Sequence, residues 1–106
     1  MHLRRVLDRL TGTTPTIYLH IDLDSLDPVE GRANEYAAPG RLRLTEVESA
    51  IGAIFDRFLV AAAAVTAYDP MLDWDGRMGE TAVRVIEAIA CESLRCRAAA
   101  ASGQVW

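Results

Sequence analysis

Two short apolar runs with a helix-length stretch between them constrain the fold of this chain more than any other feature. Residues 16–23 alternate between apolar and polar side chains, which predicts a β-strand with one buried face. Residues 59–67 are small and apolar throughout, which favours a strand buried on both faces over a buried helix. Strands separated by a helix usually pair in parallel through a right-handed crossover. The sequence therefore predicts an α/β fold.

Helical periodicity surrounds both runs. Near the start, apolar residues recur at helical spacing until the turn-forming residues 11–15 end the pattern. Thr45 and Glu48 have the spacing of a capping box, in which each side chain bonds a first-turn backbone amide of the helix that follows. That helix is expected to bury one face, made of Val47, Ile51, Ile54, Phe55 and Phe58.

The final helix and the small number of strands define the expected domain. A helix is predicted over residues 80–97, with an apolar stripe made of Val83, Ile86, Ala90 and Leu94. Residues 1–96 are expected to form the domain, and residues 97–106 a disordered tail. Two parallel strands leave both sheet edges unpaired and the apolar faces incompletely covered. The prediction is thus a partial three-layer α/β/α sheet, to be completed by further sequence or another subunit.

Composition excludes several classes of function. The net charge is -4, and the eleven basic residues form no stripe that could follow a nucleic acid backbone. All of them are Arg, so Schiff-base and phosphate-loop lysine chemistry are excluded from this chain. No apolar run reaches the roughly 20 residues that cross a bilayer. Cys91 and Cys96 are expected to be reduced thiols on different faces of a helix, in a cytoplasmic protein without a signal sequence.

Acidic residues gather at the carboxyl end of the first predicted strand, where open α/β sheets hold their ligands. Asp22 and Asp24 leave an extended backbone on the same side, about 7 Å apart, so their carboxylates can converge on one or two hard cations. Beside buried aliphatic residues such a pair costs several kcal/mol, roughly, unless it is bound or paired. We therefore expect Asp22 and Asp24 to be metal ligands, whereas Asp27, before Pro28, is expected to bond loop amides.

This acidic segment is also similar to two other kinds of site. A calcium loop requires a Glu at its twelfth position, where this chain has Ala33. Residues 22–26 also resemble the nucleophile motif of haloacid-dehalogenase phosphatases, but Leu26 stands where Thr or Val is expected and the lysine of that family is missing. The first reading fails, and the second is a minor alternative.

The segment Ile-Tyr-Leu-His-Ile-Asp-Leu-Asp-Ser-Leu-Asp-Pro, residues 17–28, resembles the signature of arginases, agmatinases and related ureohydrolases. The similarity continues through residues 38–42, Ala-Pro-Gly-Arg-Leu, which look like the Pro-Gly-Gly-Leu of that family, and on to Pro70 and Asp73. It covers roughly residues 1 to 92. The connection over residues 25–44 is long for a compact domain and is expected to border the site.

The resemblance implies a site with two manganese ions, whose bridging hydroxide attacks the carbon of a guanidino or amidino small molecule and breaks a C–N bond. Asp22 would bridge both ions and Asp24 would bind one. Asp27 would support the loop, and His20 is expected to be a hydrogen-bonded core histidine, or to orient a ligand, rather than to bind metal. The resemblance also implies a homo-oligomer.

The chain departs from the family in three places. The other metal ligands of the family, histidines and aspartates on earlier strands, have no counterpart here. Ala67 stands where the acid that pairs with the guanidinium is expected, so Asp69 is the candidate substitute. Asn34 lies in a loop segment unlike the family's and is a further candidate substrate contact, or is simply solvated. The leading hypothesis is therefore that residues 1–96 are the C-terminal part of a manganese ureohydrolase domain, active only when the missing ligands are supplied. The alternative is a non-catalytic remnant that acts as an interaction or oligomerisation domain.

Overall fold

A computed structural model describes residues 2–31 and 41–101 of the chain. Its elements follow one another as α1 (His2–Thr11), β1 (Thr16–Asp22), the short 3-10 helices η1 (Leu23–Ser25) and η2 (Pro28–Glu30), α2 (Leu44–Arg57), β2 (Leu59–Thr66) and α3 (Arg77–Ala101). β1 and β2 pair in parallel in a two-stranded sheet. The α/β fold and its parallel pair are confirmed. Within the described residues no helix is long and apolar enough to cross a membrane.

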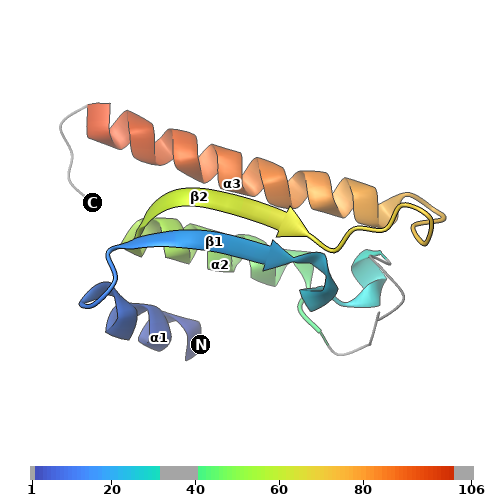
Figure 1. Ribbon diagram of the computed structural model, residues 1–106, viewed down its shortest axis with the longest axis horizontal. Coiled ribbons are helices and arrows are strands. Elements are labelled where there is room, and N and C mark those ends of the chain that lie inside the picture. The colour runs from blue at the N-terminus through green and yellow to red at the C-terminus, as the bar shows by residue number, and fades with distance from the viewer. Residues whose placement is uncertain (1, 32–40, 102–106) are drawn as a thin grey trace.

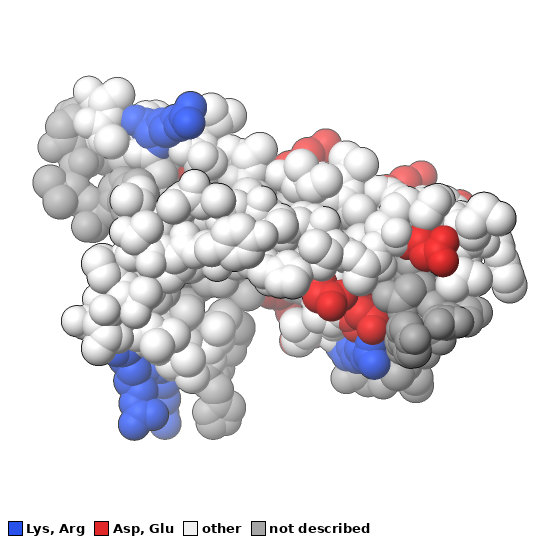
Figure 2. Space-filling view, viewed as in Figure 1, with Lys and Arg blue, Asp and Glu red and all other residues white. Residues whose placement is uncertain are grey.

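The described helices leave one face of the sheet open. α2 contacts both α1 and α3, and it lies behind the two strands in Figure 1. No described helix crosses the face that is turned toward the viewer. The middle of this side of the molecule is mostly uncharged (Figure 2). The structure thus has two of the three predicted layers.

The core lies between β1, α2 and α3. Val47, Ile51 and Phe55 of α2 and Phe58, which follows it, are buried, and Ile54 packs partly buried against the core, which confirms the predicted inner face of this helix. Leu19 from β1 and Val85 from α3 pack against this cluster. Each such side chain contributes about 1.5–3 kcal/mol by leaving water, so this contact surface is the main source of stability.

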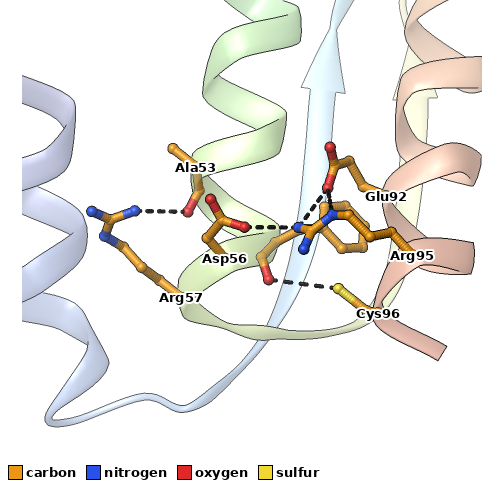
Figure 3. A network of polar contacts seen from close by, with 7 residues as sticks. Ala53, Asp56, Arg57, Glu92, Arg95 and Cys96 are labelled. Atoms are coloured by element: carbon orange, nitrogen blue, oxygen red, sulfur yellow. Dashed lines mark hydrogen bonds and ion pairs between the residues drawn. The ribbon is translucent and has the colours of Figure 1, made fainter. Parts of the chain in front are cut away.

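A polar clamp joins α2 to α3 at the edge of this core (Figure 3). The Arg95 guanidinium lies 2.7 Å from a carboxylate oxygen of Asp56 on α2 and 2.7 Å from one of Glu92 on its own helix. Beside it, the buried Cys96 thiol donates to the Phe55 carbonyl at 3.8 Å. The clamp is largely exposed, so it orients the two helices more than it stabilises them. Both thiols are free, as predicted.

The predicted capping box of α2 is wrong. The N-cap is Arg43, and its backbone N–H donates to Glu46 Oε1 at 3.0 Å. The buried Leu44 begins the helix, and its N–H donates to the carboxylate of Glu30. A tertiary contact therefore moves the helix start ahead of Thr45, and Glu48 is free to pair with Arg84 at 3.5 Å.

The predicted buried stripe of α3 is also wrong. Val83, Ile86 and Leu94 are 53%, 53% and 63% exposed, whereas Met78, Val85 and Cys96 are buried. Both sets have helical spacing, and packing against α2 selects the second. Most of β2 is likewise exposed rather than buried on both faces, because the described helices cover only one side of the sheet.

The carboxyl end of the domain also differs from expectation. α3 continues to Ala101, so residues 97–101, which were predicted as part of a disordered tail, are helical instead. Its last turn is rich in alanine, the residue with the highest helix propensity. Residues 102–106 lie outside the described residues.

Candidate metal centre

The first strand ends in a turn made by its own acidic residues. Asp22 is the last residue of β1, and its Oδ1 accepts the Asp24 N–H at 2.8 Å. The Ser25 hydroxyl donates to the Asp22 carbonyl at 2.7 Å, which completes η1. The predicted strand alternation therefore stops at Asp22, and Asp24 lies in a 3-10 turn instead.

Both carboxylates nevertheless border one cavity. A hollow of about 650 Å³ is lined by Asp22, Asp24, Ser25, Arg41, Leu42 and Glu46. Backbone bonds hold its two walls together, since Leu42 N donates to Ser25 O at 3.0 Å and Asp27 N donates to Leu42 O at 2.7 Å. The expectation that the long loop borders the acidic residues holds for its described end at residues 41 and 42.

Sequence reasoning missed two charged residues of this cavity, Glu46 and Arg41. Arg41 contacts Asp24 directly. Its Nη1 lies 3.0 Å from Asp24 Oδ1 and also donates to the Asp24 carbonyl. The ion pair is partly exposed, so solvent limits it to roughly 1 kcal/mol or less. The available signal was an arginine in Pro-Gly-Arg-Leu where the similar family motif has glycine. Arg41 thus forms an ion pair with the Asp24 carboxylate, which a bound cation would need as a ligand.

The carboxylates of Asp22 and Asp24 are suitable ligands for a divalent cation, but they are too few to hold one tightly. Carboxylate oxygens are hard ligands that suit Mn²⁺ or Mg²⁺. Within residues 2–31 and 41–101, however, no three Asp, Glu, His or Cys side chains gather closely enough to hold a metal ion. Asp22 and Asp24 are therefore two carboxylates of a site rather than a whole site; the third carboxylate that lines the cavity, Glu46, accepts the Arg43 N–H.

Three other candidate residues make local hydrogen bonds. His20 Nε2 lies 2.7 Å from the Thr66 hydroxyl oxygen of β2; the side chain is hydrogen-bonded as expected, but exposed rather than in the core. Asp27 Oδ1 accepts the Val29 N–H at 3.0 Å and caps η2. Asp69 Oδ1 accepts the Met71 N–H at 3.0 Å, and Asp69 is not among the described cavity residues. The candidate contact Asn34 lies outside the described residues.

The loop after β2 is organised by a buried aspartate. Asp73 is 8% exposed, and it accepts bonds from the Tyr68 hydroxyl at 2.8 Å, Met78 N at 3.0 Å and Gly79 N at 2.8 Å. Burial by itself raises the pKa of Asp73, but these three donors outweigh burial and hold the pKa below its usual value. The hydrogen bond from the Tyr68 hydroxyl to the Asp73 carboxylate raises the pKa of Tyr68. Asp73 thereby fastens the first turn of α3 to the loop that follows Ala67, a residue with the left-handed φ of 70°.

Known proteins resemble this chain in sequence and in fold. No protein-family model matches it. The arginase of Bacillus subtilis (strain 168) is 27% identical over 73 residues, which cover 69% of this chain and 25% of the arginase. The chain therefore spans about a quarter of the length of this curated relative.

Solved structures match over most of the chain. A formimidoylglutamase from Bacillus subtilis has a TM-score of 0.79 at 23% identity, covering 86% of this chain and 28% of its own. A hypothetical agmatinase from Burkholderia thailandensis has a TM-score of 0.76 at 20% identity, covering 91% and 31%. An arginase from Bacillus caldovelox has a TM-score of 0.69 at 22% identity, covering 84% and 31%. The resemblance to this family and the partial fold predicted from it are confirmed.

Proposed function

We propose, from the premise that this chain carries part of an arginase-like fold, that Asp22 and Asp24 supply ligands to the divalent metal centre of a ureohydrolase. The observation that carries the proposal is the pair of carboxylates lining one cavity at the carboxyl end of β1. The proposed reaction is the hydrolysis of a C–N bond in a guanidino or amidino small molecule. Two manganese ions, when bound, would supply Lewis-acid activation of water.

The contributions of the chain itself are to bind and to orient. The bond from Asp24 N to Asp22 Oδ1 fixes the direction of the Asp22 carboxylate, and Asp27 fixes the loop behind it. Oriented ligands of this kind raise metal affinity, because the site then loses less freedom on binding. Asp69 and Asn34 remain proposed substrate contacts, since Ala67 offers no carboxylate for a guanidinium. The remaining ligands must come from outside these residues for the centre to be active.

A non-catalytic role as an interaction or oligomerisation module is the second candidate. It is favoured by the lack of any three-ligand metal group among the described residues. The two candidate functions differ in one measurable property: only the first predicts that a divalent ion binds at the turn of Asp22 and Asp24.

Manganese added to the isotopically labelled chain is expected to broaden the amide NMR signals of residues 22–25 selectively. With only two carboxylates in place we expect a dissociation constant on the order of 1 mM. Replacing both acids, Asp22→Asn with Asp24→Asn, should abolish the local broadening. A matched control replaces two exposed acids on α3, Glu80→Gln with Glu87→Gln, and should leave it unchanged. Broadening that is uniform over the chain, or that survives the first double variant, would contradict the proposed ligands.

Replacing Arg41 with glutamine is expected to strengthen manganese binding at this turn about 3- to 10-fold. The change frees the Asp24 carboxylate and removes a positive charge that repels the cation, an effect of roughly 1 kcal/mol at a partly exposed site. Arg43→Gln is the matched control, because it removes an equal charge from a neighbouring exposed residue. The same NMR titration measures both variants. Equal gains would mean that net charge, and not release of Asp24, governs affinity.

A further inference from the structure

A second hollow of the molecule lies on α1, separate from the candidate metal centre. It has a volume of about 590 Å³ and is lined by Arg5, Val6, Asp8 and Arg9. None of these residues lines the cavity of the candidate metal centre. The proposed hydrolysis uses none of them either, so the charged residues around this hollow call for an explanation of their own.

The charge of α1 is opposite in sign to that of the whole chain. The helix carries three arginines and a single aspartate, whereas the chain has a net charge of -4. Figure 2 shows basic side chains projecting from the end of the molecule where α1 lies, with no acidic side chain next to them on this side. The hollow therefore lies in a locally basic region of an acidic protein, where an anion is attracted.

The one acid of this helix is already paired. Asp8 Oδ1 accepts a hydrogen bond from Arg57 Nε of α2 at 2.8 Å, and Arg57 also donates to the Ala53 carbonyl at 3.3 Å. Within residues 2–31 and 41–101, neither Arg5 nor Arg9 makes a hydrogen bond or an ion pair. Each of these two guanidinium groups therefore keeps all five of its N–H donors for water or for a ligand.

The spacing of Arg5 and Arg9 places them side by side. Residues four apart are neighbours on a helix surface, and two like charges in this arrangement destabilise the helix. Arg9 lies in the last turn of α1, where the helix dipole favours a cation, but Arg5 in the first half of the helix has no such compensation. An anion held between the two guanidinium groups would remove their repulsion and accept hydrogen bonds from both.

The charge and the number of donors favour a phosphate group as this anion. Guanidinium groups match the oxygens of carboxylates and phosphates with paired hydrogen bonds. A carboxylate has two oxygens and one negative charge, so a single arginine satisfies it. A phosphate monoester has three free oxygens and a charge of about -1.5 to -2 at pH 7, which two arginines balance. Val6 lines the same hollow and is 49% exposed, so it offers an apolar contact to the group that carries the phosphate.

We propose that Arg5 and Arg9 form a binding site for the phosphate group of a small phosphorylated molecule. The ion pair with Arg57 engages the Asp8 carboxylate, which would otherwise neutralise the two arginines. This site does not depend on the proposed metal centre, because the two share no residue.

The test is a titration of the isotopically labelled chain with inorganic phosphate at low ionic strength, observed through the arginine Nε–H signals in NMR spectra. We expect saturable shifts of the Arg5 and Arg9 signals and much smaller shifts of the other arginine signals. Acetate, with two oxygens and one charge, should bind about 5-fold more weakly or worse. Asp22→Asn with Asp24→Asn should leave the phosphate titration unchanged, so failure of the metal centre is recognised separately.

Arg5→Gln and Arg9→Gln should each weaken phosphate binding about 5-fold, because each change removes the charged donors on one side of the anion. Glutamine has nearly the helix propensity of arginine, so α1 should remain helical, and circular dichroism verifies it. Arg4→Gln is the matched control, since Arg4 is exposed on the same helix and does not line the hollow. This control should change the affinity less than about 2-fold. Asp8→Asn should strengthen binding, because it removes a negative charge from the hollow.

Three outcomes would overturn the proposal. In the first, phosphate causes no saturable shift of the Arg5 and Arg9 signals in the folded chain. In the second, Arg4→Gln weakens binding as much as Arg5→Gln does, so that net charge alone accounts for the affinity. In the third, the chain sediments with phosphatidylcholine vesicles that contain phosphatidic acid, and inorganic phosphate does not compete. The phosphate would then belong to a membrane surface and not to a small molecule.

Discussion

Replacing Gly31 with alanine is expected to lower the free energy of unfolding by about 3 kcal/mol or more. Gly31 has a φ of 130°, and a Cβ built on it would lie 2.4 Å from the backbone nitrogen of Met78. That atom belongs to the first turn of α3 and cannot rotate away as a side chain can. The variant must therefore move the η2 turn or the start of the helix, in addition to adopting a strained backbone.

Two other glycines separate the steric cost from the backbone cost. Gly76 also has a positive φ, 74°, but no atom lies within 4 Å of its built Cβ, so Gly76→Ala should cost only about 1 kcal/mol. Gly12 has open space and no such φ, so Gly12→Ala should change stability by less than about 0.5 kcal/mol. Urea denaturation followed by circular dichroism ranks the three variants. Equal losses for Gly31→Ala and Gly76→Ala would show that the close approach to Met78 is not what matters.

A substitution at Gly31 should also change the structure around the cavity lined by Asp22 and Asp24. Thr81 Oγ1 donates to the Glu30 carbonyl at 2.7 Å, and Arg77 donates to the Val29 carbonyl. The Glu30 carboxylate in turn accepts the Leu44 N–H at the start of α2. The η2 turn therefore joins both helices to the loop that carries the candidate ligands. We expect Gly31→Ala to shift the amide NMR signals of residues 22–25 as well.

Replacing Asp73 with asparagine is expected to lower the melting temperature by about 5–10 °C at neutral pH. The buried carboxylate satisfies two backbone N–H groups at the start of α3 and the Tyr68 hydroxyl, and a neutral amide accepts fewer and weaker bonds. Asp75→Asn is the control, and its melting temperature should fall less than that of Asp73→Asn. The Asp75 carboxylate is exposed and accepts the Arg77 N–H at 3.1 Å, so the smaller loss is expected there.

The same residue should leave a signature in the acid dependence of stability. Because the pKa of Asp73 is lowered in the folded chain, its contribution is fully present above the pKa of an unfolded aspartate. That contribution is lost as the pH falls through the lowered value, when the carboxylate gains a proton. Asp73→Asn should therefore remove part of the acid-induced loss of stability, and thermal melts between about pH 2 and pH 7 would measure it. A variant whose acid dependence equals that of the wild type would contradict this role.

Local patterns were sufficient to predict the strands and α2. The alternation in residues 16–22 and the spacing of Val47, Ile51 and Phe55 each need only a few neighbouring residues to be recognised. These two predictions were correct because a strand or helix with one apolar side is stable only when that side packs against the core. The pair Asp22 and Asp24 was likewise visible, since chain order places strand ends where open α/β sheets hold ligands.

Contacts between distant residues could not be predicted in this way. The bonds from Arg41 to Asp24 and from Leu44 to Glu30 join residues 17 and 14 positions apart. No local pattern contains them, and the second bond moved the start of α2 away from the predicted capping box. α3 carries two apolar sets with the same helical period, so its spacing alone could not decide which set is buried.

The amino-acid sequence by itself determined the class of fold, the parallel order of β1 and β2, the inner face of α2 and the two acids at the end of β1. Only the tertiary structure decided that Arg41 pairs with the Asp24 carboxylate, that Asp73 bonds the start of α3, and that the side of α3 with Val83, Ile86 and Leu94 is left exposed. The physical reason is the distance along the chain between the residues that interact. Backbone periodicity is a property of adjacent residues, whereas ion pairs, helix starts and burial depend on which distant surfaces meet.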